Sequence, residues 1–234
     1  FSAVDFLEQF NPPAYKIASF EIFDIPLIEK AAKLGKPMII STGLATEEDI
    51  YDAINACHRV NNHQIALLKC TSSYPAPVEK ANLLTIPDMK QRFGCEVGLS
   101  DHTLGITSPV VSVALGAKII EKHFILDKSI GGPDAAFSLD KDEFSLMVKH
   151  VREAEKSLGN VNYELDEKAK ASKQLGRSLF VVKDIKMGET LTPENIRSIR
   201  PGYGISPKFY FDVLGKKANK ELKRGTPLRW EDVV

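Results

Sequence analysis

Two short runs place a histidine at the end of an expected strand. Ser100-Asp-His-Thr103 closes a strand predicted over residues 96–100, and Glu121-Lys-His123 closes one predicted over residues 118–124. Adjacent parallel strands lie about 4.8 Å apart, so imidazoles at neighbouring strand ends can share one divalent ion. Two histidines with open coordination positions suit a catalytic metal that keeps water or substrate bound. Each histidine alone could equally be a hydrogen-bonded core residue, and the pairing favours a metal site formed by His102 and His123.

A cation and several hydroxyl groups belong to the other expected strands. Lys16 lies on a strand predicted over residues 14–19, and Ser19, Ser41 and Ser72 lie at three successive strand ends. A ligand that carries both a carboxylate and a phosphate needs such a cation and such donors. Each serine is also an ordinary turn residue, and that interpretation stays open.

Three further charged residues are candidates for a role in a site. Glu21 follows the strand that carries Lys16 and could act as a general acid or base. Asp134 ends the tight turn Gly131-Gly-Pro-Asp134, where aspartate is also favoured for backbone reasons alone. Arg200 opens the Gly/Pro loop over residues 200–205 and could reach a ligand carboxylate, although such a loop is also simply a turn.

Strands and helices alternate over the first 158 residues, in about five β/α units. The expected strands cover residues 14–19, 37–42, 65–70, 96–100 and 118–124, and the expected helices cover residues 3–10, 26–34, 46–60, 82–93, 109–115 and 140–158. This alternation implies a parallel sheet with helices outside, either an open doubly wound sheet or a (β/α)₈ barrel. No Gly-x-Gly-x-x-Gly turn follows a strand, which disfavours a dinucleotide-binding sheet. Polar residues at the strand ends favour the barrel, and we expect about three further units before Phe1.

The remaining residues predict a linker and a small second domain. Residues 159–176 are polar and rich in Lys and Ala, so we expect a linker between domains at 1–158 and 177–234. The second domain is expected to be β-rich. It is predicted to contain strands over 178–183 and 196–199, a capped short helix over 191–195, and short turns and strands over 214–218 and 223–228.

The overall charge and the cysteines limit the classes of partner. Lys plus Arg and Asp plus Glu number 31 each, which gives no support for a nucleic-acid or membrane-surface partner. No apolar run approaches the ~20 residues that span a bilayer. Cys57, Cys70 and Cys95 are odd in number and widely spaced, so we expect reduced thiols in a cytoplasmic protein.

Several runs together resemble the sialic acid synthase family. The matching runs are Tyr15-Lys-Ile-Ala-Ser-Phe-Glu21, Ile40-Ser-Thr-Gly43, Cys70-Thr-Ser-Ser-Tyr-Pro75, Gly98-Leu-Ser-Asp-His-Thr103, Ile120-Glu-Lys-His-Phe124 and Gly132-Pro-Asp134. The tail from Arg177 resembles the antifreeze-like domain (SAF domain, a β-clip fold) that is fused to these synthases. The resemblance implies an α/β fold with a (β/α)₈ TIM barrel, here about its last five units, and a C-terminal SAF domain.

The resemblance also implies a reaction, a metal and a set of contacts. The reaction is the condensation of phosphoenolpyruvate with an amino-sugar aldehyde, a transferase reaction that releases phosphate. His102 and His123 would hold a divalent ion, most commonly Mn²⁺, with Mg²⁺ or Co²⁺ as alternatives. The residues that would contact phosphoenolpyruvate are Lys16, Ser19, Ser41, Ser72 and Ser100, and those that would face the sugar are Glu21, Tyr74 and Asp134. By analogy the SAF domain swaps across a homodimer, so that Arg200 completes the partner's site.

Two runs narrow the expected sugar. Ser129-Ile-Gly-Gly-Pro-Asp-Ala-Ala-Phe-Ser138 and Ser198-Ile-Arg-Pro-Gly-Tyr-Gly204 resemble family members that use 2,4-diacetamido-2,4,6-trideoxy-altrose. Members that use N-acetylmannosamine typically carry His-Lys-Ala after the Gly-Pro-Asp, an Asn in place of Ser72 and a His in place of Lys69. We therefore expect the trideoxy sugar, with N-acetylmannosamine or a legionaminate precursor as the alternative.

Two other classes of function compete with this synthase. A non-catalytic carbohydrate-binding module would use the first domain as a scaffold, which has no need for two metal-spaced histidines. A keto-deoxy sugar phosphate synthase would also use phosphoenolpyruvate, but those enzymes lack the antifreeze-like tail.

Overall fold

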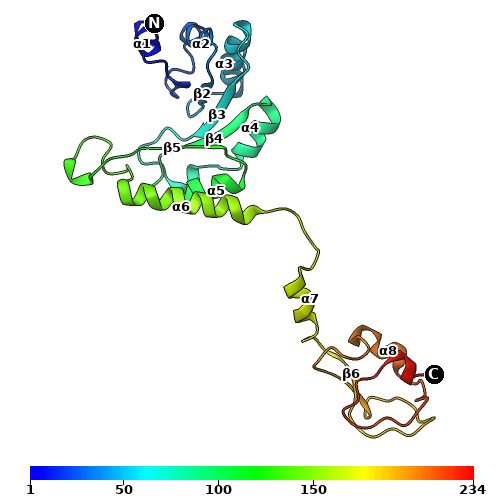
Figure 1. Ribbon diagram of the computed structural model, residues 1–234. Coiled ribbons are helices and arrows are strands. Elements are labelled where there is room, and N and C mark those ends of the chain that lie inside the picture. The colour runs from blue at the N-terminus through cyan, green and yellow to red at the C-terminus, as the bar shows by residue number, and fades with distance from the viewer. The chain divides into compact units, whose positions relative to one another are not determined.

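A five-stranded parallel sheet forms the framework of the first unit of the protein (Figure 1). The computed structural model describes residues 1–234 and divides into two compact units, Phe1–Asn160 and Val161–Val234. The strands of the first unit are β1 (Tyr15–Ile17), β2 (Met38–Ser41), β3 (Ile65–Cys70), β4 (Glu96–Asp101) and β5 (Ile119–Lys122), and its helices are α1 (Ser2–Glu8), α2 (Ile25–Ala32), α3 (Glu47–Arg59), α4 (Thr85–Phe93), α5 (Thr107–Ala114) and α6 (Lys141–Leu158). Short 3₁₀ helices cover Val78–Lys80 and Lys128–Ile130.

The strand order distinguishes the two folds that alternating strands and helices allow, an open doubly wound sheet and a (β/α)₈ barrel. Each strand pairs in parallel with the next one along the chain, in the order β1-β2-β3-β4-β5. An open doubly wound sheet reverses its strand order at a switch point, and this sheet does not. The sheet is therefore part of a (β/α)₈ barrel, as predicted. The parallel arrangement also brings the carboxyl ends of all the strands to one edge.

Local sequence signals fix where the two longest helices begin. Thr46 caps α3, and its capping box with Asp49 is formed as the sequence predicts. Asp140 caps α6 in the same way through Glu143. Such caps contribute about 1 kcal/mol each to helix stability. Each cap therefore fixes the residue at which its helix begins.

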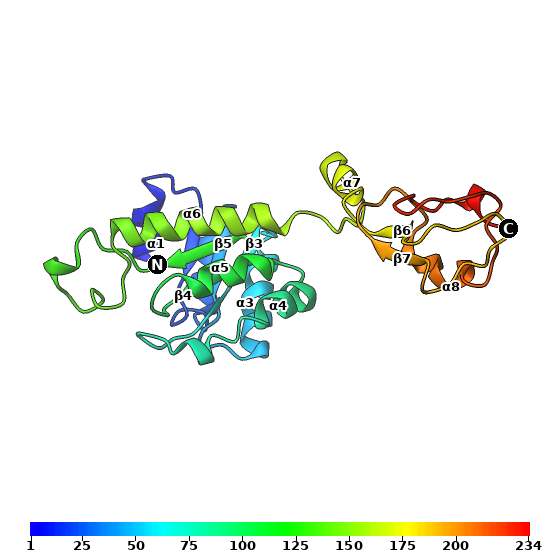
Figure 2. The same ribbon diagram turned by 90° about the horizontal axis from the view of Figure 1, so that it is seen from below.

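The core of the first unit lies between the strands and the helices that cover them. Its members are apolar and fully buried, among them Ile28, Met38, Ile40, Leu67, Ile86 and Val97. Figure 2 shows α6 running alongside α5 and β5. Of the apolar residues on one face of α6, Met147 is buried, whereas Val148 and Leu158 are exposed. That face lines a groove together with Val113 and Ile120.

The second unit has its own small core. Its antiparallel pair is β6 (Ser178–Val181) and β7 (Ile196–Ile199), and its helices are α7 (Glu167–Lys173) and α8 (Tyr210–Val213). Two further 3₁₀ helices cover Pro207–Phe209 and Trp230–Asp232. Isolated bridges extend the pairing, and the buried residues include Leu179, Ile185, Leu191, Ile196 and Leu228. This β-rich unit agrees with the prediction, and α7 lies inside the stretch expected to be a linker.

One predicted helix of the second unit is wrong. Residues 193–195 form a turn instead, and the side chain of Asn195 folds back onto the backbone that precedes it. Its Oδ1 accepts the Thr192 N–H at 2.7 Å, and its Nδ2 donates to the Thr190 carbonyl oxygen at 2.9 Å. Asparagine side chains favour such local bonds over a continuing helix.

Two further expectations concern the cysteines and membranes. All three cysteines are free thiols, in agreement with the expectation from their number and spacing. None of the helices has both the length and the apolar character that crossing a bilayer requires.

Candidate functional site

The two histidines come together because β4 and β5 are in register at their carboxyl ends. The parallel ladder pairs Ser100 with Glu121, and its last pair directly precedes His102 and His123. The imidazole centroids are 5.1 Å apart. A cavity of about 270 Å³ opens at this edge of the sheet, between the two strand ends. The predicted pairing is thus a consequence of strand register.

A hydrogen bond at His102 and an ion-pair contact at His123 orient the two rings. Nδ1 of His102 lies 3.0 Å from the carbonyl oxygen of Thr71, and Nδ1 of His123 lies 3.6 Å from Oδ2 of Asp134. A carbonyl oxygen can only accept, so in neutral His102 the proton sits on Nδ1 and Nε2 presents a lone pair. An acceptor on one ring nitrogen and a free lone pair on the other is the usual arrangement of a metal-binding imidazole.

The surroundings shift the pKa values of the two imidazoles in opposite directions. Burial disfavours the charged form of His102, but hydrogen bonds with the Cys70 thiol and the Thr71 carbonyl oxygen outweigh it, so the pKa of His102 is raised. Burial and the neighbouring His102 lower the pKa of His123, against the opposing effect of Asp134. The same cluster lowers the pKa of the Cys70 thiol, because hydrogen bonds, that with His102 first among them, outweigh its burial. The lowered pKa of His123 favours its neutral form, in which one ring nitrogen carries a free lone pair.

The donor set fits a divalent ion that keeps open positions. No group of three His, Cys, Asp or Glu side chains is arranged to hold a metal. The protein can therefore offer two nitrogen ligands, His102 and His123, and leave the remaining positions to water or substrate.

Aromatic side chains form one wall of the site. The ring of Tyr74 packs 4.3 Å from His102 and 6.0 Å from His123, centroid to centroid. Phe137 lies 5.0 Å from His123 and 5.8 Å from Tyr74. Tyr74 is still 44% exposed, so it is accessible to a molecule that binds beside the two histidines.

A polar chain links four strand ends across the sheet. Nζ of Lys16 donates to Oγ of Ser41 at 2.8 Å and lies 3.4 Å from Oε2 of Glu121. Ser100 Oγ donates to the other carboxylate oxygen of Glu121 at 2.6 Å. Three predicted residues, Lys16, Ser41 and Ser100, are thus brought together by Glu121.

The two other predicted serines gather around Gly43, just after β2. Ser19 Oγ accepts the N–H of Gly43 at 3.0 Å. A Cβ at Gly43 would overlap Ser72 Oγ and would lie 2.9 Å from both Ser19 Oγ and Cys70 Sγ. Only glycine leaves these hydroxyl groups in place. Cys70 connects this group to the histidines, since its sulfur lies 3.8 Å from Nδ1 of His102.

Two predicted residues stand apart from these contacts. The side chain of Glu21 is exposed and forms no hydrogen bond or ion pair within the unit. Arg200 belongs to the second unit, where its side chain is also exposed and unpaired.

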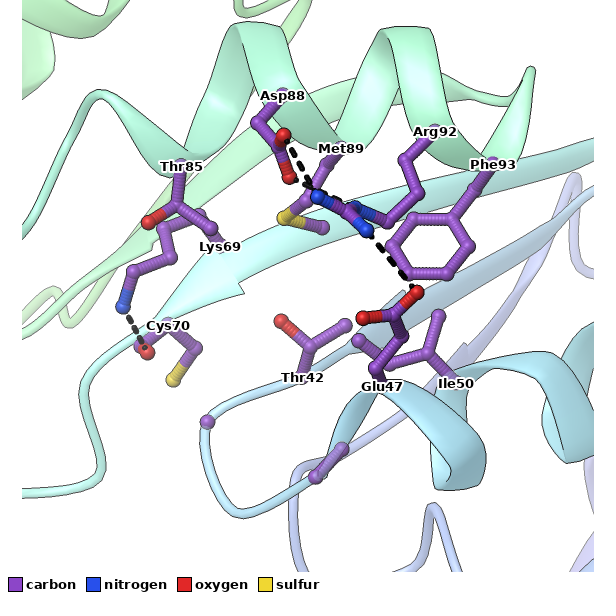
Figure 3. A pocket seen from close by; sticks show the side chains of 12 residues that line it. Thr42, Glu47, Ile50, Lys69, Cys70, Thr85, Asp88, Met89, Arg92 and Phe93 are labelled. Atoms are coloured by element: carbon purple, nitrogen blue, oxygen red, sulfur yellow. Dashed lines mark hydrogen bonds and ion pairs between the residues drawn. The ribbon is translucent and has the colours of Figure 1, made fainter.

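A separate pocket of about 350 Å³ lies behind β3, against α3 and α4 (Figure 3). Arg92 pairs there with Asp88 and Glu47, each at 3.1 Å. Lys69 Nζ donates to the carbonyl oxygen of Cys70 at 2.7 Å, and burial lowers the pKa of Lys69. Arg92, Asp88 and Glu47 satisfy one another, and Lys69 holds the backbone that leads to Thr71 and Ser72.

Glu121 was not predicted as a site residue, although it lies in one of the runs that resemble the sialic acid synthase family. Alternation along a strand places Glu121 and His123 on one face and Lys122 on the other, and this signal was available. The role of Phe137 depends on a loop that folds back over the strand ends, and no local pattern marks it. Cys70 ends β3, and its contact with His102 depends on how that strand end faces its neighbour.

Comparison with known proteins identifies both units. The model of the NeuB family matches residues 1–163, and the model of the SAF domain matches residues 176–234. Two pseudaminic acid synthases match nearly the whole chain. That of Helicobacter pylori is 49% identical over 99% of this chain and 68% of its own length, and that of Campylobacter jejuni is 50% identical over 98% and 67%. The chain therefore spans about two thirds of the length of these relatives.

Two further comparisons are informative. The N,N'-diacetyllegionaminic acid synthase of Campylobacter jejuni is 38% identical over 97% of this chain and 69% of its own length. The crystal structure of the spore coat polysaccharide biosynthesis protein SpsE from Bacillus subtilis has a TM-score of 0.66 at 34% identity, covering 100% of this chain and 71% of that one.

The bond between His102 and Thr71 predicts a tautomer. At a pH of about 9, where imidazoles are ordinarily neutral, His102 should carry its proton on Nδ1. Two-bond ¹H–¹⁵N correlation spectra of the protein, assigned with a His102→Gln variant, report the protonated nitrogen. His63, an exposed residue between α3 and β3 whose side chain makes no hydrogen bond or ion pair, serves as the internal control for an unconstrained ring. An Nε2-protonated His102 would contradict the arrangement described for this site.

Proposed function

Because this chain belongs to the NeuB family, we propose that it condenses phosphoenolpyruvate with 2,4-diacetamido-2,4,6-trideoxy-altrose to give pseudaminic acid and phosphate. The choice of sugar rests on the difference in sequence identity between this chain and two synthases of one organism. The chain is 50% identical to the pseudaminic acid synthase of Campylobacter jejuni and 38% identical to its N,N'-diacetyllegionaminic acid synthase. A synthase acting on N-acetylmannosamine or a legionaminate precursor is the alternative.

Phosphoenolpyruvate would bind along the polar chain and beside Gly43. Lys16 is 31% exposed at its side chain and is held towards the cavity by Ser41 and Glu121, so its charge is available to an anion. Ser19 accepts a backbone N–H and keeps its own proton to donate. Ser72 adds a further hydroxyl donor, and Ser100, whose proton Glu121 accepts in this structure, would donate to the ligand in place of that carboxylate. One fixed cation with several neutral donors suits a ligand that carries a phosphate and a carboxylate.

His102 and His123 would hold a divalent ion, Mn²⁺ in our proposal, with Mg²⁺ or Co²⁺ as alternatives. When bound, such an ion supplies Lewis-acid chemistry, which polarises the aldehyde oxygen of the sugar and lowers the pKa of a coordinated water. The chain's part is to present two lone pairs from rings whose other nitrogens are fixed by Thr71 and Asp134.

The proposed reaction forms one carbon–carbon bond and breaks one carbon–oxygen bond. C3 of phosphoenolpyruvate bonds to the aldehyde carbon, whose oxygen takes up a proton. Water adds at C2 and loses one proton. Phosphate then leaves with the electrons of the C2–O bond and takes up the proton that the new C2 hydroxyl loses, which produces a keto group. Asp134 and Tyr74 border the place of the sugar, and the unpaired carboxylate of Glu21 is available as the general acid or base. This reaction makes the protein a transferase, and its three free thiols fit a cytoplasmic enzyme.

Phosphate release from the full-length protein tests the proposal. The protein is incubated with phosphoenolpyruvate, Mn²⁺ and one of two sugars, 2,4-diacetamido-2,4,6-trideoxy-altrose or N-acetylmannosamine. We expect release with the trideoxy sugar alone, abolished by EDTA and restored by added Mn²⁺, because the aldehyde is not polarised without the metal. Release with N-acetylmannosamine alone would overturn the choice of sugar, and release with neither sugar would favour a carbohydrate-binding module.

We also propose that the protein is a domain-swapped homodimer in which Arg200 completes the site of the partner chain. What supports this is that Arg200 is exposed and makes no hydrogen bond or ion pair within its own unit. An exposed guanidinium with five unused donors is suited to a carboxylate or carbonyl group of a ligand.

Mixing two inactive variants tests the swap. Arg200→Ala and His102→Ala should each be inactive, because one loses the arginine and the other a proposed metal ligand. If Arg200 acts on the partner's site, unfolding and refolding them together should restore about a quarter of the unmodified activity, since half of the dimers are mixed and each has one intact site. A mixture no more active than its components would place Arg200 at the site of its own chain. His102→Ala mixed with His123→Ala is the matched control and should stay inactive.

A further inference from the structure

We propose that the buried ion pair between Asp101 and Lys122 is a positioning pair, which sets the distance and orientation of His102 and His123 for the metal. The inference rests on the metal site proposed above and assigns a role to two residues outside it. Each member of the pair directly precedes one of the two histidines in the chain, so any movement of the pair moves an imidazole.

The pair is the last rung of the ladder between β4 and β5. Asp101 and Lys122 face each other in the parallel register, with Oδ2 and Nζ only 2.6 Å apart. Since strand side chains alternate, the pair lies on the strand face opposite Ser100 and Glu121, and both of its residues also contribute to the lining of the cavity. It ties the two strand ends together at the point where hydrogen bonding between the strands stops.

The same two side chains also fix the backbone beyond His102. Oδ1 of Asp101 accepts the N–H of Thr103 at 3.1 Å, and Oδ2 accepts the Thr103 hydroxyl at 3.1 Å. Lys122 donates to the carbonyl oxygen of Thr103. The Thr103 hydroxyl also lies 3.2 Å from Ser108 Oγ, in the first turn of α5, and can accept the Ser108 proton. Three of the four polar contacts of Thr103 therefore lead to the pair.

The carbonyl groups of the histidines are fixed as well. The His102 carbonyl oxygen accepts the N–H of Ala76 and the His123 carbonyl oxygen accepts the N–H of Leu139, each at 2.9 Å. With the residues on both sides of His102 held, the remaining freedom of the imidazoles lies in the relative position of the strand ends. The ion pair controls that position.

Stability is a weak explanation for such a pair. The side chains of Lys122 and Asp101 are 0% and 2% exposed, whereas every other ion pair has at least one side chain more than a third exposed. Desolvation of two buried charges offsets most of their attraction, and apolar replacements are often as stable. Buried ion pairs are better attested as devices that select one geometry, and here that geometry is the approach of two metal ligands.

The test replaces both charges at once, so that neither is left buried without a partner. In Asp101→Asn/Lys122→Met we expect Mn²⁺ affinity to fall by about 10- to 100-fold, the usual cost of losing a contact behind a metal ligand. The melting temperature should shift by no more than about 4 °C. Titration of Mn²⁺ followed by the electron paramagnetic resonance of the free ion measures the affinity without turnover. In the full-length enzyme, activity lost at low Mn²⁺ should return at saturating Mn²⁺, which a general loss of structure would not allow.

The matched control is Asp5→Asn/Lys30→Met. It makes the same two changes in an exposed ion pair of 2.7 Å between α1 and α2, and it should leave the Mn²⁺ affinity unchanged. If the buried double variant does not fold, Asp101→Asn/Lys122→Gln, which leaves no buried charge and keeps a polar group at both positions, takes its place with the same expected loss of affinity.

Two results would contradict the inference in different ways. Equal Mn²⁺ affinity of the unmodified protein and the folded buried variant would overturn the positioning role alone. No Mn²⁺ binding by the unmodified protein would overturn the proposed metal site, and the positioning role with it.

Discussion

The register between β4 and β5 is the constraint on which the site depends. A parallel ladder gives each residue one partner across the strand, and a slip of one residue would turn every side chain to the opposite face. With Ser100 opposite Glu121, the two imidazoles extend from the same face at the same height, 5.1 Å apart. The serines, Lys16 and the aromatic wall have a common target only because that register holds.

The order of the strands brings the other site residues to the same place in the first unit. Because the strands follow one another without reversal, the contributions of β1, β2, β3, β4 and β5 meet at one edge in the order in which the chain supplies them. Glu121 reaches from β5 back to Lys16 on β1, which shows how far the sheet curves within five strands. Curvature turns side chains that are far apart in sequence into one polar network.

Much of this arrangement could be predicted from the sequence, and the failures have physical causes. Apolar runs and capping signals located the strands, α3 and α6, because those signals act within a few residues. The short helix predicted over residues 191–195 was wrong, because the side chain of Asn195 forms local hydrogen bonds with the preceding backbone. Glu121 and the pair of Asp101 and Lys122 were not predicted, because their roles depend on which face of the strand each side chain occupies. Tyr74 and Asp134 were expected on resemblance alone, and only the loops after β3 and β5 bring them to the histidines.

Anomalous diffraction from crystals soaked with Mn²⁺ tests the central claim most directly. The account predicts one strong manganese peak in the first unit, at about 2.0–2.2 Å from Nε2 of both His102 and His123. The Nδ1 atoms of the two rings should remain turned towards Thr71 and Asp134. A peak bonded to other residues, or to Nδ1 of either ring, would contradict the claim that strand register and these contacts build a metal site.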